Sequence, residues 1–199
     1  MTTGIILLII ALPFTSMVME TVTAQTKPIM DVREGDVIFQ TSLSQQSPLI
    51  QIATRSKITH CGIVVMKNGK PYVLETLKTL AVTPLDKFIA RGEDGKYWLK
   101  RSNKENIRIK YGSYLGKPYD LAFRFDNDKF YCSELIYDIY KNQLGIELCK
   151  PKKVNDYLIL GTSNLPQIKK AMKKRGITQE QYAVAPADIF ESDHLKEVK

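Results

Sequence analysis

Short stretches in which apolar and polar residues alternate recur along the chain, and turn residues separate them. Alternation of this kind is typical of strands with one buried face. It predicts strands at residues 36–40, 60–66, 71–76, 79–83 and 96–101. Because hairpins rather than strand–helix–strand repeats connect them, we expect an α+β domain in which an antiparallel sheet packs against helices.

Apolar residues at helical spacing predict the helices. Ser47-Pro48 and Pro84 each begin a short amphipathic helix, since proline is favoured in a first helical turn. A longer helix is predicted from Phe130 to near Gly145, and another around residues 104–115. Residues 150–176 are interpreted as a helical excursion, and whether it covers a cleft stays open.

The dipeptide Asn68-Gly69 lies between two apolar runs and predicts a two-residue hairpin turn. With these two residues in the turn, Val64 faces Val73 across the hairpin. The position of the turn therefore determines which side chains share a face of the two strands.

His60, Gly62 and Glu75 share one face of this hairpin, and Gly62 leaves room between the imidazole and the carboxylate. Cys61 points to the opposite face with Leu74, because side chains alternate along a strand. We therefore interpret Cys61 as a core residue and His60 with Glu75 as a polar pair.

Three cysteines are an odd number, so at least one free thiol is expected in an oxidising compartment. Cys132 is predicted in the first turn of its helix, facing inward with Leu135 and Ile136. A helix N-terminus lowers a thiol pKa and offers a backbone donor to an oxyanion. With His60 as the base and Glu75 as the group that orients it, Cys132 completes the parts needed for amide or ester cleavage.

The composition is that of one globular domain, with 29 Lys and Arg against 21 Asp and Glu among 199 residues. Basic residues gather at Lys150, Lys152, Lys153, Lys169, Lys170, Lys173, Lys174 and Arg175. These clusters predict either contact with an anionic cell-envelope surface or a solvated helix face. No nucleic-acid-binding pattern is present. The separated histidines supply no metal ligand set, so we expect neither a metal nor a cofactor.

The N-terminus carries the apolar run Gly4–Phe14, which is too short for a membrane span of about 20 residues. Val22-Thr23-Ala24 fits the small-residue rule for signal-peptide cleavage. We therefore predict a signal peptide at residues 1–24, a mature domain at residues 25–199, and a periplasmic or extracellular location. An uncleaved anchor or a buried N-terminal helix is the alternative.

Four motifs resemble those of one known family. They are Gly35-Asp36-Val37-Ile38-Phe39, His60-Cys61-Gly62-Ile63-Val64 with Glu75, Gly116-Lys117-Pro118-Tyr119-Asp120, and Tyr131-Cys132-Ser133-Glu134-Leu135. In these motifs the chain resembles the YiiX-like branch of the circularly permuted papain-like amidases, which are relatives of NlpC-type cell-wall peptidases. The permuted order is also present, because His60 precedes Cys132. The resemblance covers about residues 31–144, and Pro186-Ala187-Asp188 resembles a closing motif of the branch.

The resemblance implies a permuted papain-like fold with Cys132 as nucleophile, His60 as general base and acid, and Glu75 as the residue that orients His60. Tyr131 is a candidate for lining the substrate pocket. Asp36 is either a substrate contact or a turn residue, and the two interpretations stay open.

The function expected from these residues is that of an exported cysteine amidase or peptidase, acting on an envelope peptide or on an N-acylated or lipid-linked substrate. An acyltransferase or thioesterase-like enzyme is one alternative, disfavoured because Tyr131-Cys132-Ser133-Glu134 replaces the Asn-Cys-Glu-His motif of lecithin:retinol acyltransferase-like relatives. A non-catalytic envelope-binding module is the other. The sequence leaves open the oligomeric state and a Cys61–Cys149 disulfide.

Overall fold

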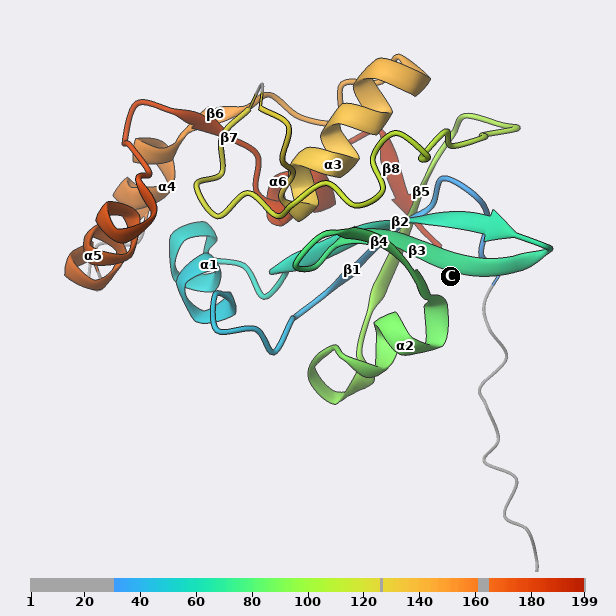
Figure 1. The fold of residues 1–199 in the computed structure, drawn as a ribbon, viewed down its shortest axis with the longest axis horizontal. Helices are drawn as coiled ribbons and strands as arrows, with labels where there is room; N and C mark the ends of the chain where they lie inside the picture. Colours follow the sequence, from blue (N-terminus) through green and yellow to red (C-terminus); the bar gives the residue numbers. More distant parts are fainter. Residues whose placement is uncertain (1–30, 126, 161–164, 199) are drawn as a thin grey trace, which may run out of the picture.

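A six-stranded antiparallel sheet forms the centre of the protein (Figure 1). The computed structural model describes residues 31–125, 127–160 and 165–198, so the predicted signal peptide lies outside the described residues. The strand order is β4-β3-β2-β1-β5-β8. The strands are β1 (Val37–Gln40), β2 (His60–Lys67), β3 (Lys70–Thr76), β4 (Leu80–Pro84), β5 (Trp98–Ser102) and β8 (Leu195–Glu197).

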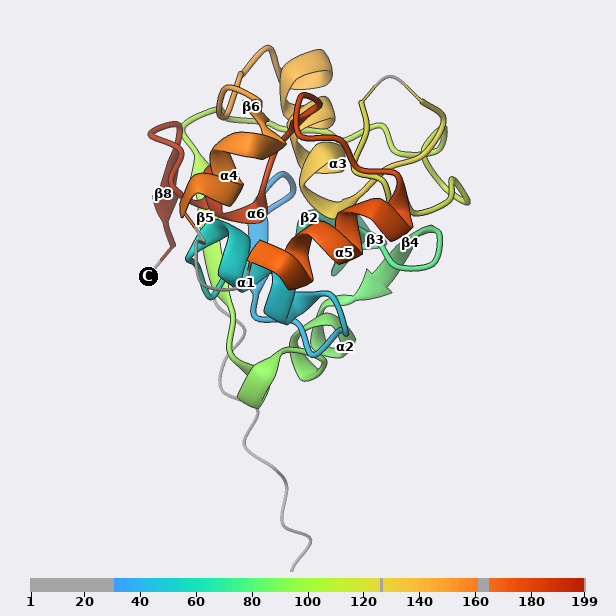
Figure 2. The same ribbon diagram turned by 90° about the vertical axis from the view of Figure 1, so that its left-hand side faces the viewer.

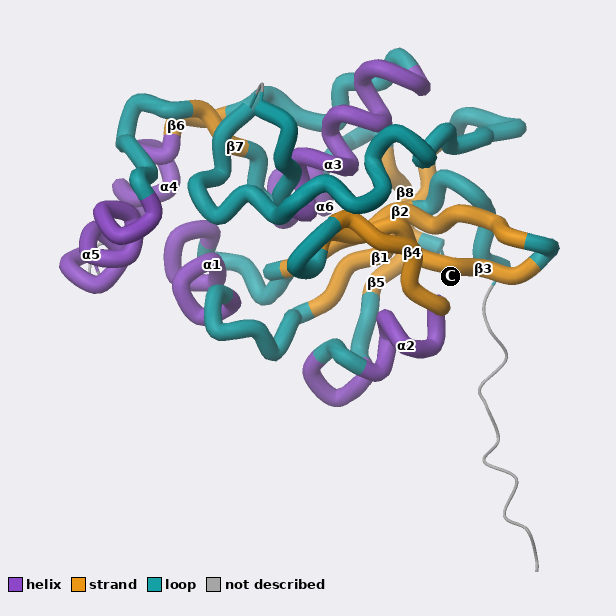
Figure 3. Tube along the Cα trace, in the orientation of Figure 1, coloured by secondary structure: helices purple, strands orange, loops and turns teal. Residues whose placement is uncertain are grey.

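Short helices surround the sheet, as the tube in Figure 3 shows. They are α1 (Ser47–Thr54), α2 (Leu85–Ala90), α3 (Cys132–Ile139), α4 (Val154–Leu160), α5 (Leu165–Arg175) and α6 (Pro186–Phe190). A π-helical turn, η2 (Tyr140–Leu144), extends α3, and a 3₁₀ turn, η1 (Glu93–Gly95), follows α2. The strands β6 (Lys152–Lys153) and β7 (Tyr182–Ala183) pair in a small second sheet. Among the described residues, no helix has both the length and the apolarity to span a membrane.

Helices cover both faces of the sheet, with α3 and α6 on one side and α2 on the other (Figure 1). Cys61, Ile63 and Leu74 pack with α3 in the larger hydrophobic core. Val64 and Val73 pack with Phe88 of α2 in a smaller core. This division follows from the alternation of side chains along β2 and β3.

A third apolar cluster lies beside the sheet, where α1, α4 and α5 meet (Figure 2). Leu158, Ile168 and Met172 are its buried members, and Leu49 and Ile52 of α1 pack against them. The described part of residues 150–176 thus contains two helices, α4 and α5, after the short strand β6, and these helices pack against α1.

The hairpin β2–β3 has the predicted turn and register. Val64 faces Val73, and Lys67 faces Lys70. Asn68 and Gly69 have φ values of 51° and 72°, the left-handed conformation that a tight hairpin turn requires. The strands predicted by alternation and the helices begun by Ser47 and Pro84 are also present.

The helix predicted around residues 104–115 is wrong, because this segment is irregular and ends in a turn. Side chains from other elements bind its backbone and replace helical hydrogen bonds. The N–H of Ile109 donates to Glu34 Oε1 at 2.8 Å, and the N–H of Lys110 donates to Gln143 Oε1 at 2.9 Å. Ile107 and Ile109 are two residues apart and both pack on the core. This spacing indicates an extended segment and not a helix.

Candidate active site

The helix predicted from Phe130 begins two residues later, at Cys132, which therefore lies in the first turn of α3 as predicted and is 4% exposed. Tyr131 precedes the helix in an extended conformation, and its N–H donates to Glu134 Oε2 at 3.3 Å. This contact is one half of a capping box. The first N–H groups of a helix have no partner within it, so the sulfur of Cys132 lies beside backbone donors and partial positive charge.

Two further hydrogen bonds fix the start of α3 against the segment after β7. The N–H of Val184 donates to the Tyr131 hydroxyl at 3.1 Å, and the Ser133 hydroxyl donates to the Val184 carbonyl at 2.7 Å. Both contacts are buried. The position of Cys132 is therefore set by its two sequence neighbours.

His60 and Glu75 form the polar pair that the hairpin register predicts. His60 Nε2 lies 2.8 Å from Glu75 Oε2, and the two side chains are 12% and 0% exposed. The imidazole also stacks on Phe88, with ring centroids 5.6 Å apart. A Cβ on Gly62 would overlap the Val73 side chain on the neighbouring strand, so glycine is the residue that fits at this position beside the pair.

Glu75 has a second partner that the sequence analysis missed. Arg91, which directly follows α2, donates through Nη2 to Glu75 Oε1. Burial raises the pKa of Glu75, but the interactions with His60, Thr83 and Arg91 together outweigh burial, so the pKa falls below its usual value. Glu75 is therefore a carboxylate held between two cations.

His60 is the first residue of β2, and its side chain interacts with both Cys132 and Glu75. Burial disfavours the imidazolium, but the hydrogen bonds to Cys132 and Glu75 prevail and raise the pKa of His60 to about 9. Since Glu75 engages Nε2, Nδ1 is the nitrogen left for the thiol. The imidazole is thus oriented by the carboxylate, as the three-residue arrangement of a nucleophilic hydrolase requires.

Hydrogen bonding from Cys61 and then His60 lowers the pKa of Cys132 well below its usual value, against the opposing effect of burial. The high pKa of His60 and the low pKa of Cys132 together favour a thiolate–imidazolium pair. Such a pair is the reactive form of a cysteine nucleophile.

The thiol of Cys132 borders an apolar cavity of about 140 Å³. Helices α1, α4 and α5 contribute half of the residues that line it. Among the lining residues are Leu49, Ile50, Ala53, Tyr119, Tyr131, Val154, Leu158, Ile168, Ala171, Met172 and Arg175. Tyr131 thus lines a pocket, as expected from the sequence, whereas the contributions of Tyr119 and of the helices to the lining were not predicted.

Asp36 does not reach this pocket. Its carboxylate is 1% exposed, accepts the N–H of Arg33 at 2.8 Å and pairs with Arg101, whose Nε lies 2.6 Å from Oδ1. Of the two interpretations of Asp36, the structure places it as a turn residue in a buried ion pair. Asp120 likewise closes a turn, accepting from the N–H groups of Ala122 and Arg124.

A cysteine at the start of a helix, packed on an antiparallel sheet whose histidine comes earlier in the chain, defines a permuted papain-like cysteine hydrolase. The chain belongs to that family: residues 31–199 match the family described as permuted papain-like amidase enzyme, YaeF/YiiX, C92 family. The resemblance drawn from the motifs is thereby confirmed.

Two relatives support the assignment. The uncharacterized protein YiiX of Escherichia coli K12 is 36% identical over 174 residues, covering 82% of this chain and 84% of the relative. The crystal structure of metalloprotein YiiX from Escherichia coli O157:H7 superposes with a TM-score of 0.73 at 36% identity, covering 84% of this chain and 96% of that one.

The crystallised relative is described as a metalloprotein, which raises the question of whether the side chains of this protein could hold a metal ion. Within the ranges that the structure describes, His, Cys, Asp and Glu side chains nowhere gather in threes in a way that could hold a metal ion. Protein sites for zinc and similar ions use three or four such donors. The described residues therefore do not fit a metal centre.

Proposed function

We propose that this protein is a cysteine amidase in which Cys132, His60 and Glu75 act together, and that the acyl part of its substrate occupies the apolar pocket. The observation that carries the proposal is that the oriented histidine interacts with a buried cysteine, and that this cysteine lines the pocket. Membership in an amidase family supports the same reaction class.

In the first half of the reaction, the Cys132 thiolate attacks the carbonyl carbon of the amide. The carbonyl oxygen becomes an oxyanion, to which the N–H of Cys132 donates at the start of α3. The His60 imidazolium then gives its proton to the departing nitrogen, and the C–N bond breaks. A thioester on Cys132 and a free amine result.

In the second half, neutral His60 takes a proton from water, and the resulting hydroxide attacks the thioester carbon. The C–S bond breaks, the acid leaves, and the thiolate and the imidazolium are restored. Glu75 keeps Nε2 engaged throughout, so Nδ1 faces the sulfur in both halves. Arg91 supports Glu75 from the opposite oxygen.

The apolar lining favours an N-acylated amine over a cell-wall peptide. Apolar walls gain free energy when they cover an acyl group, whereas a peptide carries polar groups that need partners when buried. Arg175, which donates to Gln46 at 3.2 Å, is the cation on the pocket wall. An acyl chain that packs among the helices, with its head group near Cys132, matches this arrangement of apolar and charged side chains.

The substrate proposal is tested with N-acyl amino acids of increasing chain length and with defined muropeptides. Hydrolysis that accelerates with chain length supports the acyl substrate, whereas cleavage of muropeptides alone overturns it. Adding a primary amine as acceptor separates hydrolysis from acyl transfer, because a transferase forms the new amide in place of the free acid.

The outer face of α5 supports a role at an anionic envelope surface. Lys169, Lys170, Lys173 and Lys174 are exposed there, while Ile168 and Met172 on the same helix are buried toward the pocket. Among the described residues, none of the four lysines has an ion-pair partner. A basic face beside an apolar pocket suits a substrate held in an anionic bilayer.

Export is the last part of the proposal and rests on the apolar run and cleavage pattern of residues 1–24. Mass spectrometry of the protein recovered from its producing cell tests it. A mature chain that begins at Gln25 supports export, and a chain that retains residues 1–24 contradicts cleavage at this site.

A further inference from the structure

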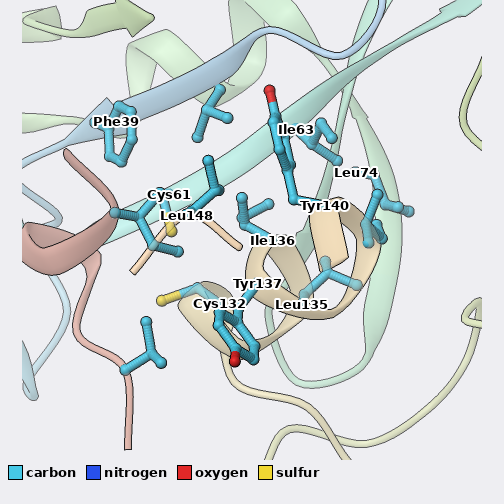
Figure 4. Packing of buried hydrophobic residues seen from close by; sticks show 14 of the residues in the cluster. Phe39, Cys61, Ile63, Leu74, Cys132, Leu135, Ile136, Tyr137, Tyr140 and Leu148 are labelled. Atoms are coloured by element: carbon cyan, nitrogen blue, oxygen red, sulfur yellow. The ribbon is translucent and has the colours of Figure 1, made fainter. Parts of the chain in front are cut away.

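Cys61 follows the proposed base directly in sequence, yet its side chain lies on the opposite face of β2, in the core that contains α3. It is fully buried. In Figure 4 the sulfur of Cys61 points from β2 toward the first turn of α3, where the sulfur of Cys132 lies. Both cysteines are free thiols. A buried thiol therefore faces the sulfur that the reaction uses.

The two thiols differ in ionisation. Burial, followed by the interaction with Cys132, raises the pKa of Cys61 well above its usual value, while the pKa of Cys132 is lowered. Cys61 accordingly keeps its proton when Cys132 is a thiolate. A protonated thiol is a hydrogen-bond donor, although a weak one, and a charged acceptor strengthens the bond.

We propose that Cys61 is a positioning residue of the reaction: its thiol donates a hydrogen bond to the Cys132 sulfur and holds the thiolate at the pocket wall. His60 then approaches the sulfur from the end of β2, and Cys61 supports it from within the core. The inference rests on the proposed function, in which Cys132 is the nucleophile.

The other titratable groups around Cys132 do not supply this donor. His60 is committed to the proton transfers. The Tyr131 hydroxyl lies 3.1 Å from the backbone nitrogen of Val184, so it is directed at the segment after β7. Tyr119 and Tyr131 both have a pKa raised above the usual value by burial, so neither adds charge at neutral pH. Cys61 is the thiol directed at the nucleophile from β2 (Figure 4).

The test compares Cys61→Ala with Cys61→Ser in the full chain. Both substitutions remove the sulfur from the core, but serine retains a donor, so the pair separates hydrogen bonding from packing. Cys149→Ala is the matched control, because it removes a partly buried thiol elsewhere in the protein. Thermal unfolding of each variant verifies that it folds.

The measurement is the rate of iodoacetamide alkylation of Cys132 between about pH 5 and pH 8, followed by peptide mass spectrometry. Burial raises the pKa of Cys149 to about 12, so it stays protonated in this range. In Cys61→Ala we expect the alkylation profile to move to higher pH and the rate at about pH 6 to fall roughly threefold to tenfold. Cys61→Ser and Cys149→Ala keep the wild-type profile.

An unchanged profile in Cys61→Ala overturns the inference, and so does an equal shift in Cys61→Ser, which would assign the effect to packing. Failure of the proposed function has a different signature. In that case Cys132 of the wild-type protein is itself unreactive near neutral pH, whatever residue 61 is.

Discussion

The two walls that meet at Cys132 are built in opposite ways. On one side, His60, Glu75 and Arg91 form a histidine corner in which each polar group has a charged partner. On the other side, α1, α4 and α5 line an apolar pocket that has Arg175 on its wall and the exposed lysines of α5 on its outer surface. The corner can move protons but has no means of selecting an acyl group. The pocket can select an acyl group but has few polar side chains that could take part in the reaction. We therefore expect substitutions in the corner to impair catalysis and substitutions in the pocket to impair substrate selection.

The variant Cys132→Ala separates catalysis from substrate binding by the largest expected effect. We expect an activity loss of about 10⁴-fold or more, since the nucleophile of a covalent mechanism has no substitute. The pocket should stay intact, so binding of a long-chain N-acyl amino acid measured by calorimetry should change little. A Cys132→Ala variant that keeps its biological effect would favour the non-catalytic binding module instead.

Glu75→Gln tests the corner alone. Glu75 helps to raise the pKa of His60 to about 9, and the imidazolium is lost as the pH rises through that value. Removing the carboxylate lowers this pKa, so the alkaline limb of the activity profile should move to lower pH and kcat should fall about 10²-fold. An unmoved alkaline limb contradicts the role given to Glu75.

Ala171→Phe tests the pocket alone, because Ala171 lines it from α5. We expect KM for long-chain substrates to rise about tenfold while short-chain turnover and Cys132 alkylation stay unchanged. Ala90→Phe, at the exposed end of α2, is the matched control. Equal losses for short and long chains would show that the pocket does not select the acyl group.

The smallest effect concerns the outer surface of α5. Replacing Lys169, Lys170, Lys173 and Lys174 by Gln should reduce binding to phosphatidylglycerol-containing vesicles about fivefold at low salt, with no effect on soluble substrates. The control replaces Lys57, Lys67, Lys70 and Lys78, which are also exposed, and so removes the same charge. Equal losses in the two variants would assign binding to net charge rather than to α5.

The histidine corner was largely predictable because a hairpin is a local structure. The Asn68-Gly69 turn sets the register, and the register places His60 and Glu75 on one face without further knowledge of the fold. The early position of Cys132 in α3 follows from local helix signals as well. The hairpin and the start of α3 lie far apart in the chain. Their association in one site was predicted only from the resemblance to the family motifs.

The apolar pocket was not predictable in the same way, since it depends on packing between distant segments. Arg175 reaches Gln46, and Ile168 meets Leu49, contacts that no local pattern specifies. Cys61 was correctly assigned to the core, but alternation along a strand does not tell which side chain of a facing helix it meets. The segment 104–115 failed because Glu34 and Gln143, both distant in sequence, bind its backbone.

The central claim is that Cys132 is a thiolate paired with protonated His60. The pH dependence of iodoacetamide alkylation of Cys132 in the wild-type protein and in His60→Ala tests it most directly. The account predicts a thiol pKa well below the reference value of about 8.5, raised toward that value when His60 is removed. A Cys132 that reacts only near the reference pKa, or identically in both proteins, would contradict it.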